Sequence, residues 1–322
     1  MALWLIRRIL QAIGVIWAMT LLVFIGIHVI GDPSAILIPP EASAEDRVRL
    51  IASLKLDLPL WQQYLLFLKG VVTGNIGNSF VYNRSAIQVI LERMPATLEL
   101  AFCAYALSII IGIPLGLYCG LRENSWLARA IMGVSVLGFS IPTFWLGIML
   151  IMFFAVDLGL LPSGGRGATV NVLGVPISIL TWDGLRHILL PALTLSLFKI
   201  AFMIRLVRIG VKDILPQQYI MFARAKGLSS RRIIVMHILR NLLIPVVTIS
   251  GMELGTLIAF SVVTETVFGW PGMGKLIVDS INMLDRPLVV AYLMIITALF
   301  CVINILVDIA YTLLDPRVRM AR

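Results

Sequence analysis

Long apolar runs without Asp, Glu, Lys or Arg dominate the chain. A helix needs about 20 apolar residues to cross the roughly 30 Å core of a bilayer. Four charge-free runs are long enough, and they cover 9–31, 100–121, 130–156 and 287–307. Two more, 188–204 and 241–264, carry one charge each, Lys199 in the first and Glu253 in the second. The pattern predicts six membrane-spanning helices in an all-α polytopic membrane protein.

The first run follows Arg7 and Arg8, as in a signal peptide, but it exceeds the usual 7–15 apolar residues and no small-x-small cleavage site closes it. We therefore expect an uncleaved signal anchor, 9–31, with its N-terminus in the cytoplasm. Alternation then predicts the sides of the connections. Segments 122–129, 205–240 and the C-terminal 308–322 are expected in the cytoplasm, and 32–99, 157–187 and 265–286 outside.

The distribution of cations agrees with this topology. Segment 205–240 holds eight Lys and Arg, against two each in 157–187 and 265–286. Short cytoplasmic loops carry such an excess. The formal net charge of +9 is therefore a topology signal, and no nucleic-acid partner is predicted.

Composition narrows the class of protein further. The chain of 322 residues is 60% hydrophobic and 13% charged, with a mean hydropathy of +0.99, far from a soluble domain. Its three cysteines and three histidines are scattered without ligand spacing. No disulfide framework, metal site or redox centre is predicted.

The outward segment 32–99 is too long for a turn. Amphipathic stretches at 45–54 and 61–68 predict short helices on the outer membrane surface. Gly70, Gly74 and Gly77 predict a bend before a helix that enters the second span. The alternative is a solvated connector. We expect one transmembrane domain over 1–322, with core spans in 100–314 and a cytoplasmic loop at 212–241.

That cytoplasmic loop predicts two helices broken at a glycine. Pro216 is suited to begin the first helix, Gly227 to the break, and Ser229 or Ser230 to cap the second. Ala223 and Gly227 lie four residues apart, so one small face would let another protein approach. Nearby cations would pair with acids of that protein, or they serve only as topology anchors.

The loop resembles the coupling loop of bacterial ABC importer permeases. The run Ala223-Arg224-Ala225-Lys226-Gly227-Leu228, with His237-x-Leu239-Arg240-Asn241 and Pro245, looks like the dipeptide, oligopeptide and nickel branch. Met221-Phe222-Ala223 stands where the general pattern has Glu-Ala-Ala, so no glutamate salt bridge carries over. Further motifs of the branch follow in order at 95–100, 138–145, 161–165, 190–195, 265–274 and 314–317.

The resemblance implies a type I ABC importer permease fold with a coupling-helix hairpin between spans 4 and 5. The chain would be half of a pore in the bacterial inner membrane, with both termini cytoplasmic. A second, similar permease, two cytoplasmic ATPase subunits and an external binding protein would complete the importer. The chain would not be an enzyme: it lacks a Gly-x-x-x-x-Gly-Lys-Ser/Thr loop, so ATP and Mg²⁺ would sit on the ATPases.

Site residues follow from the resemblance and, for Glu253, from its charge inside an apolar span. The coupling contact would comprise Ala223, Arg224, Ala225, Lys226, Gly227 and Leu228. The translocation pathway would comprise Glu253, Pro142 and Phe144. The external gate, which would also meet the binding protein, would comprise Glu265, Phe268, Trp270 and Pro271; ordinary interfacial anchoring is the alternative for these four.

Glu253 is costly inside a membrane and so faces a cavity or a partner. It would touch a peptide's amino terminus or pair with a cation of the partner permease, whereas Lys199 would extend towards the cytoplasm. The cargo expected from the resemblance is a dipeptide or oligopeptide; nickel chelates, glutathione and opines stay open. An ion-coupled secondary transporter is the alternative of another class, but it would need a coupling-ion site.

Overall fold

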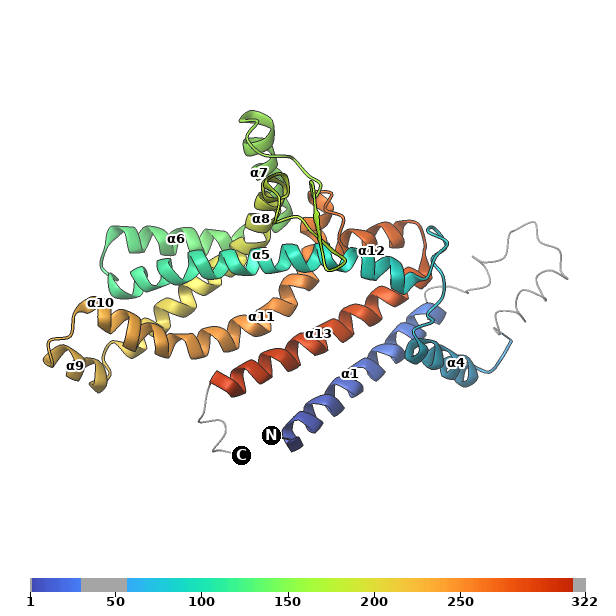
Figure 1. Ribbon diagram of the computed structural model, residues 1–322, viewed down its shortest axis with the longest axis horizontal. Coiled ribbons are helices and arrows are strands. Elements are labelled where there is room, and N and C mark those ends of the chain that lie inside the picture. Colours follow the sequence, from blue (N-terminus) through green and yellow to red (C-terminus); the bar gives the residue numbers. More distant parts are fainter. Residues whose placement is uncertain (1, 30–56, 315–322) are drawn as a thin grey trace. The chain divides into compact units, whose positions relative to one another are not determined.

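The computed structural model describes residues 2–29 and 57–314, and helices dominate them (Figure 1). The helices in chain order are α1 Ala2–Val29, α4 Leu60–Thr73, α5 Ala86–Leu121, α6 Trp126–Ser140, α7 Thr143–Leu150, the π-helical η1 Ile151–Asp157, α8 Trp182–Ile214, α9 Gln218–Ala225, α10 Ser230–Arg232, the π-helical η2 Ile233–Leu239, α11 Arg240–Val267, α12 Met273–Asn282 and α13 Arg286–Leu314. An antiparallel hairpin of β1 (Val170–Val172) and β2 (Val175–Ile177) precedes α8.

Four described helices are long and apolar enough to cross a membrane. They contain the windows Ile6–Gly26, Ala86–Leu121, Trp182–Ile214 and Arg286–Ile309, which correspond to the first, second, fourth and sixth predicted spans. A bent pair of helices, Trp126–Ser140 with Thr143–Asp157, makes a fifth if it is counted as one span. The helix α11 covers the run 241–264. Six spans therefore stay a prediction, while the all-α membrane class is confirmed.

The third predicted span, 130–156, is not one helix. The α6 helix ends at Ser140, Ile141 is extended (φ −81°, ψ 123°), and α7 begins after Pro142. The two halves bend by 109°. A proline has no N–H and disfavours helical backbone at the residue before it. The predicted span is therefore bent at Pro142, and whether its two halves cross the membrane as one span stays a prediction.

The chain divides into two compact units. The first comprises Met1–Glu92 with Leu276–Cys301, and the second comprises Arg93–Lys275 with Val302–Arg322. In the first unit α1 packs on α4 through Phe24 and Tyr64, whose ring centroids are 5.3 Å apart. The hydroxyls of Thr20 and Tyr64 share a hydrogen bond of 2.8 Å. The prediction of a single membrane domain is not tested by this division.

Glycines end α4 as the sequence predicts. Gly74 adopts φ +71° and Gly77 φ +114°, a backbone that favours glycine, and α5 then runs unbroken through Pro95 and Pro114. The predicted helix at 61–68 is α4. The amphipathic stretch 45–54 lies outside the described residues.

A stripe of glycines brings α5 against α8 in the second unit. A Cβ atom added to Gly112 would lie 2.6 Å from the Met203 side chain, and one added to Gly116 would lie 2.7 Å from Val207. Gly120 meets Val211 in the same way. Small residues four apart let two membrane helices approach closely. This contact fixes α8, which leads directly into the predicted coupling loop.

Candidate functional site

A Schellman motif ends α9 at the predicted glycine. Gly227 has φ +73°, its N–H donates to the Arg224 carbonyl at 2.9 Å, and the Leu228 N–H donates to the Ala223 carbonyl at 3.2 Å. These two bonds satisfy carbonyls that a helix end leaves free. The predicted break between two helices is therefore present, although α9 begins at Gln218 and not directly after Pro216. Ser229 occupies the N-cap position of α10 without a side-chain cap bond.

One predicted coupling residue faces inward. Ala223 is only 5% exposed and lies in an apolar cluster with Val207, Ile220 and Leu242. Its small side chain packs within this chain, and a contact of its face with a partner stays a prediction. Leu228 is half-buried against the same cluster.

The exposed face of α9 is apolar at one end and cationic at the other. Met221 is 54% and Phe222 69% exposed. Arg224, Ala225, Lys226 and Gly227 are also exposed. The sequence interpretation did not include Phe222 among the coupling residues. The available signal was its place in Met221-Phe222-Ala223, the triplet that differs from the general Glu-Ala-Ala pattern. Apolar exposed side chains beside cations make a surface suited to a protein partner.

The same end of the second unit carries an ion pair between two predicted cytoplasmic segments. Lys212, near the end of α8, lies 2.8 Å from Glu123 in the turn between α5 and α6. The hydrogen bond from Lys212 lowers the pKa of the Glu123 carboxyl. Figure 1 shows that α9 and α10 lie at this end. The turn and the predicted coupling loop therefore share one side of the unit, as the topology requires.

The two charges of the apolar spans pair with each other. The Lys199 ammonium on α8 donates to the Glu253 carboxylate on α11. Its second acceptor is the Thr256 hydroxyl, at 2.9 Å. Lys199 therefore does not extend towards the cytoplasm as expected. Glu253 has a cation within its own chain, and none from another subunit is needed for charge balance.

The other two predicted pathway residues lie at the bend after α6. Pro142 is the residue before the first turn of α7, and Phe144 is 51% exposed within that turn. Neither is among the described contacts of Glu253. A common pathway for the three stays a prediction.

The predicted external gate is a buried cluster. The Glu265 carboxylate accepts hydrogen bonds from the Thr97 hydroxyl at 2.7 Å, the Ser261 hydroxyl at 3.0 Å and the Lys275 N–H at 3.0 Å. Phe268 is buried. The Trp270 indole N–H donates to the Ala96 carbonyl at 2.9 Å.

The side chains of Glu265, Phe268 and Trp270 are turned inward in this chain. Each of the three side chains is at most 1% exposed, because each is held to the start of α5 or to the end of α11. Pro271 is partly exposed. The gate role stays a prediction. In this structure the cluster holds the turn between α11 and α12 in place.

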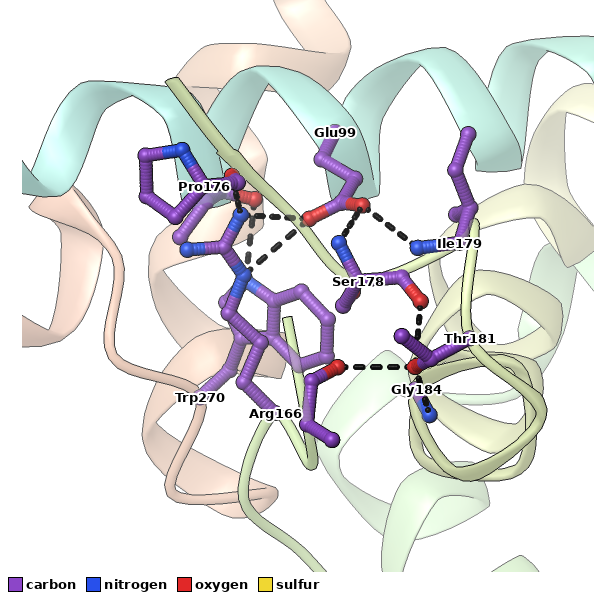
Figure 2. Close-up of polar contacts among 10 residues, drawn as sticks. Glu99, Arg166, Pro176, Ser178, Ile179, Thr181, Gly184 and Trp270 are labelled. Atoms are coloured by element: carbon purple, nitrogen blue, oxygen red, sulfur yellow. Dashed lines mark hydrogen bonds and ion pairs between the residues drawn. The ribbon is translucent and has the colours of Figure 1, made fainter. Parts of the chain in front are cut away.

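A second cluster, which the sequence interpretation missed, fastens the β hairpin (Figure 2). The Glu99 carboxylate on α5 pairs with Arg166 at 2.6 Å and accepts the Ser178 and Ile179 N–H groups at 2.6 and 2.8 Å. Arg166 also donates to the Pro176 carbonyl at 2.7 Å. Its guanidinium carbon lies 5.9 Å from the centroid of the Trp270 ring.

The available signals for this cluster were an acid at the start of an apolar run and an arginine within a glycine-rich stretch. Both side chains are nearly buried, with 6% and 10% exposure. No group of three or more His, Cys, Asp or Glu placed to hold a metal is found among residues 2–29 and 57–314.

Comparison with known proteins places the chain in a family. Residues 112–320 match the binding-protein-dependent transport system inner membrane component, and residues 1–101 match the N-terminal region of such membrane components. The dipeptide transport system permease protein DppB of Escherichia coli K12 is 35% identical over 98% of both chains. The oligopeptide transport system permease protein AppB of Bacillus subtilis 168 is 38% identical over 99% of both.

A solved structure shares the fold. The MetNI methionine ABC transporter in inward facing conformations aligns with a TM-score of 0.54 and 20% identity, covering 71% of this chain and 97% of that one. The helical fold is thus that of an ABC importer permease. The family match covers most of the sequence, and it shows that the chain belongs to the binding-protein-dependent transport system inner membrane components.

Proposed function

We propose that the chain forms half of the membrane pore of an ATP-driven importer for dipeptides or oligopeptides that an external binding protein delivers. End-to-end similarity to permeases named for dipeptide and oligopeptide transport supports the cargo. The observation that carries the mechanism is the exposed, glycine-terminated helix α9 at the end of α8.

Energy enters this protein by contact. Two ATPase subunits hold ATP and Mg²⁺. The exposed face of α9 lies in a cleft of one ATPase subunit and presents Met221, Phe222, Arg224 and Lys226 to it. Because Ala223 packs α9 onto α8 and α11 through the apolar cluster, a push on α9 moves these helices together. A rigid-body shift of this kind switches a pore between its two faces.

The remaining parts of the importer follow from the same assignment. A second, similar permease completes the pore as a heterodimer in the bacterial inner membrane. The N-terminus, the turn at Glu123, the coupling loop and the C-terminus face the cytoplasm. The distribution of Lys and Arg supports this orientation, and so does the Glu123–Lys212 pair at the end that carries α9.

Glutathione is a second candidate cargo. The glutathione transport system permease protein GsiC of Escherichia coli O6:H1 is 36% identical over 98% of both chains. Glutathione is a tripeptide, so it shares amide bonds and an α-amino group with the dipeptides and oligopeptides proposed above.

The test is peptide uptake by the complete importer in proteoliposomes, with ATP on the ATPase side. Wild type imports labelled dipeptide and hydrolyses ATP faster when loaded binding protein is present. Phe222→Asp places a charge on the exposed face of α9, so uptake and stimulation fall together and the ATPases no longer co-purify. The matched control is Tyr82→Asp, on a residue 37% exposed in the predicted outward segment.

Tyr82→Asp should leave ATPase association unchanged. Uptake driven by an ion gradient without ATP would instead establish the secondary-transporter alternative. Unchanged association in Phe222→Asp would exclude α9 as the ATPase contact.

A further inference from the structure

The Lys199–Glu253 pair lies halfway along both of its helices. Lys199 is 17 residues from the start of α8, and Glu253 is 13 from the start of α11. At 1.5 Å per residue the pair lies about 26 and 20 Å from those ends. Glu253 lies at the middle of the predicted span 241–264, and Lys199 lies about 8 Å from the cytoplasmic end of the predicted span 188–204. The two charges therefore meet within the apolar part of the membrane. Ionisable residues at that depth are costly and mark substrate or ion pathways.

Stability is a weak reason for such a pair. Replacing a buried ion pair by apolar residues of similar volume is often neutral or stabilising, because two charges must be taken out of water. The second unit already holds α8 against its neighbours by apolar packing that involves Val207, Leu242 and Val246. The pair thus needs another explanation.

The pair is asymmetric in a way that favours a ligand for the carboxylate. The Glu253 side chain is 30% exposed and the Lys199 side chain 12%. The Thr256 hydroxyl accepts from Lys199 and lies 3.0 Å from Glu253 Oε2. Lys199 therefore keeps a hydrogen-bond partner if the carboxylate turns away.

A cavity adjoins the pair. It has a volume of about 10 Å³ and is lined by Tyr105 and Ser108 on α5, by Lys199, Phe202 and Met203 on α8, and by Glu253 and Leu257 on α11. That volume holds no more than about one water molecule. In this conformation the ammonium of Lys199 occupies the position at Glu253 that an external cation would take.

We propose that Glu253 is a binding site for the α-ammonium group of a translocating peptide, and that Lys199 is the internal cation which the peptide displaces. This inference rests on the proposed function and names the chemistry of its pathway. Every unmodified peptide carries that group, so the site is independent of side chains. Exchange of one ammonium for another keeps the carboxylate neutralised throughout, and the displaced Lys199 ammonium keeps the Thr256 hydroxyl as a hydrogen-bond acceptor.

The experiment compares uptake by the complete importer with wild type, the double variant Lys199→Met/Glu253→Gln, and the exchanged pair Lys199→Glu/Glu253→Lys. The double variant leaves no unpaired charge. We expect its uptake of a labelled dipeptide to fall about tenfold or more, equivalent to 1.4 kcal/mol, while loaded binding protein still stimulates ATP hydrolysis. Fewer peptides would then be imported per ATP.

The exchanged pair separates this role from a structural one. It restores the ion pair but presents a cation at position 253, so the inference predicts low uptake. A structural role predicts recovery to the wild-type rate. The matched control is Lys212→Met/Glu123→Gln, which removes another Lys–Glu pair from the end of the same helix and should leave uptake unchanged.

Wild-type uptake by the double variant would overturn the inference and leave the proposed function intact. Failure of the wild-type importer to take up any peptide with ATP would overturn the proposed function itself. A third measurement does not depend on variants. A dipeptide carrying a photoreactive side chain should crosslink to α8 or α11 in the turning-over wild type, and crosslinks confined to other helices would contradict the site.

Discussion

Substitutions at Gly227 separate the backbone role of this glycine from its contact with a partner. Gly227 has φ +73°, and a Cβ built there lies within 4 Å of no described neighbour. The cost of Gly227→Ala inside this chain is therefore the left-handed backbone alone, about 1–2 kcal/mol. That corresponds to a factor of roughly 5–30 in the population of the native turn. Asn tolerates this conformation better than Ala, so Gly227→Asn should be milder.

The docked partner adds a second effect that only a large side chain reveals. Gly227→Trp has a backbone cost similar to that of Ala, and it also fills the space where the ATPase approaches. We expect uptake and binding-protein-stimulated ATP hydrolysis to decrease in the order Gly, Asn, Ala, Trp, with Trp about tenfold or more below Ala.

Both rates are measured in proteoliposomes, at equal amounts of assembled importer. Equal activities of the Ala and Trp variants would mean that the glycine serves only the Schellman turn. Wild-type activity of Gly227→Trp would refute the coupling assignment.

Three further predictions test the packing and the charges. Gly116→Leu should lower the melting temperature, because a Cβ there already lies 2.7 Å from Val207 and overpacking costs about 1–3 kcal/mol; Gly133→Leu, at a position with no described neighbour within 4 Å, should not. Glu99→Gln leaves Arg166 buried without its counter-charge and should destabilise the protein by about 3–5 kcal/mol, measured by thermal unfolding in detergent. A smaller loss of stability in Glu99→Leu/Arg166→Leu would confirm that the unpaired charge is the cause. An equal loss of stability would contradict it. The pKa of Glu123 is lowered by Lys212, so their ion pair is complete above the usual carboxyl range and is lost only as the pH falls through the lowered value. Because the pair is exposed, Glu123→Gln should leave uptake between pH 6 and 8 unchanged, and a change of several-fold would contradict this.

Much of the fold could be predicted because its signals are local. A long apolar run with at most one charge predicts a membrane-spanning helix from local composition, and α1, α5, α8 and α13 confirm it. Gly227 and Gly74 end helices because few other residues adopt a positive φ at low cost. The bend after α6 had a local signal too, Pro142, but a proline does not fix the size of the bend, which is 109° here.

The partners of the charged side chains depend on packing between distant segments. Glu99 meets Arg166 across 67 positions, Lys199 meets Glu253 across 54, and Thr97 meets Glu265 across 168. A local sequence pattern predicts a helix, but it does not predict which other helix packs against it. The sequence by itself thus determined the membrane class, the spans that local composition defines and the break at Gly227. Only the tertiary structure decided that Ala223 lies inside and that the two membrane charges neutralise each other, because both depend on which faces of α8, α9 and α11 come into contact.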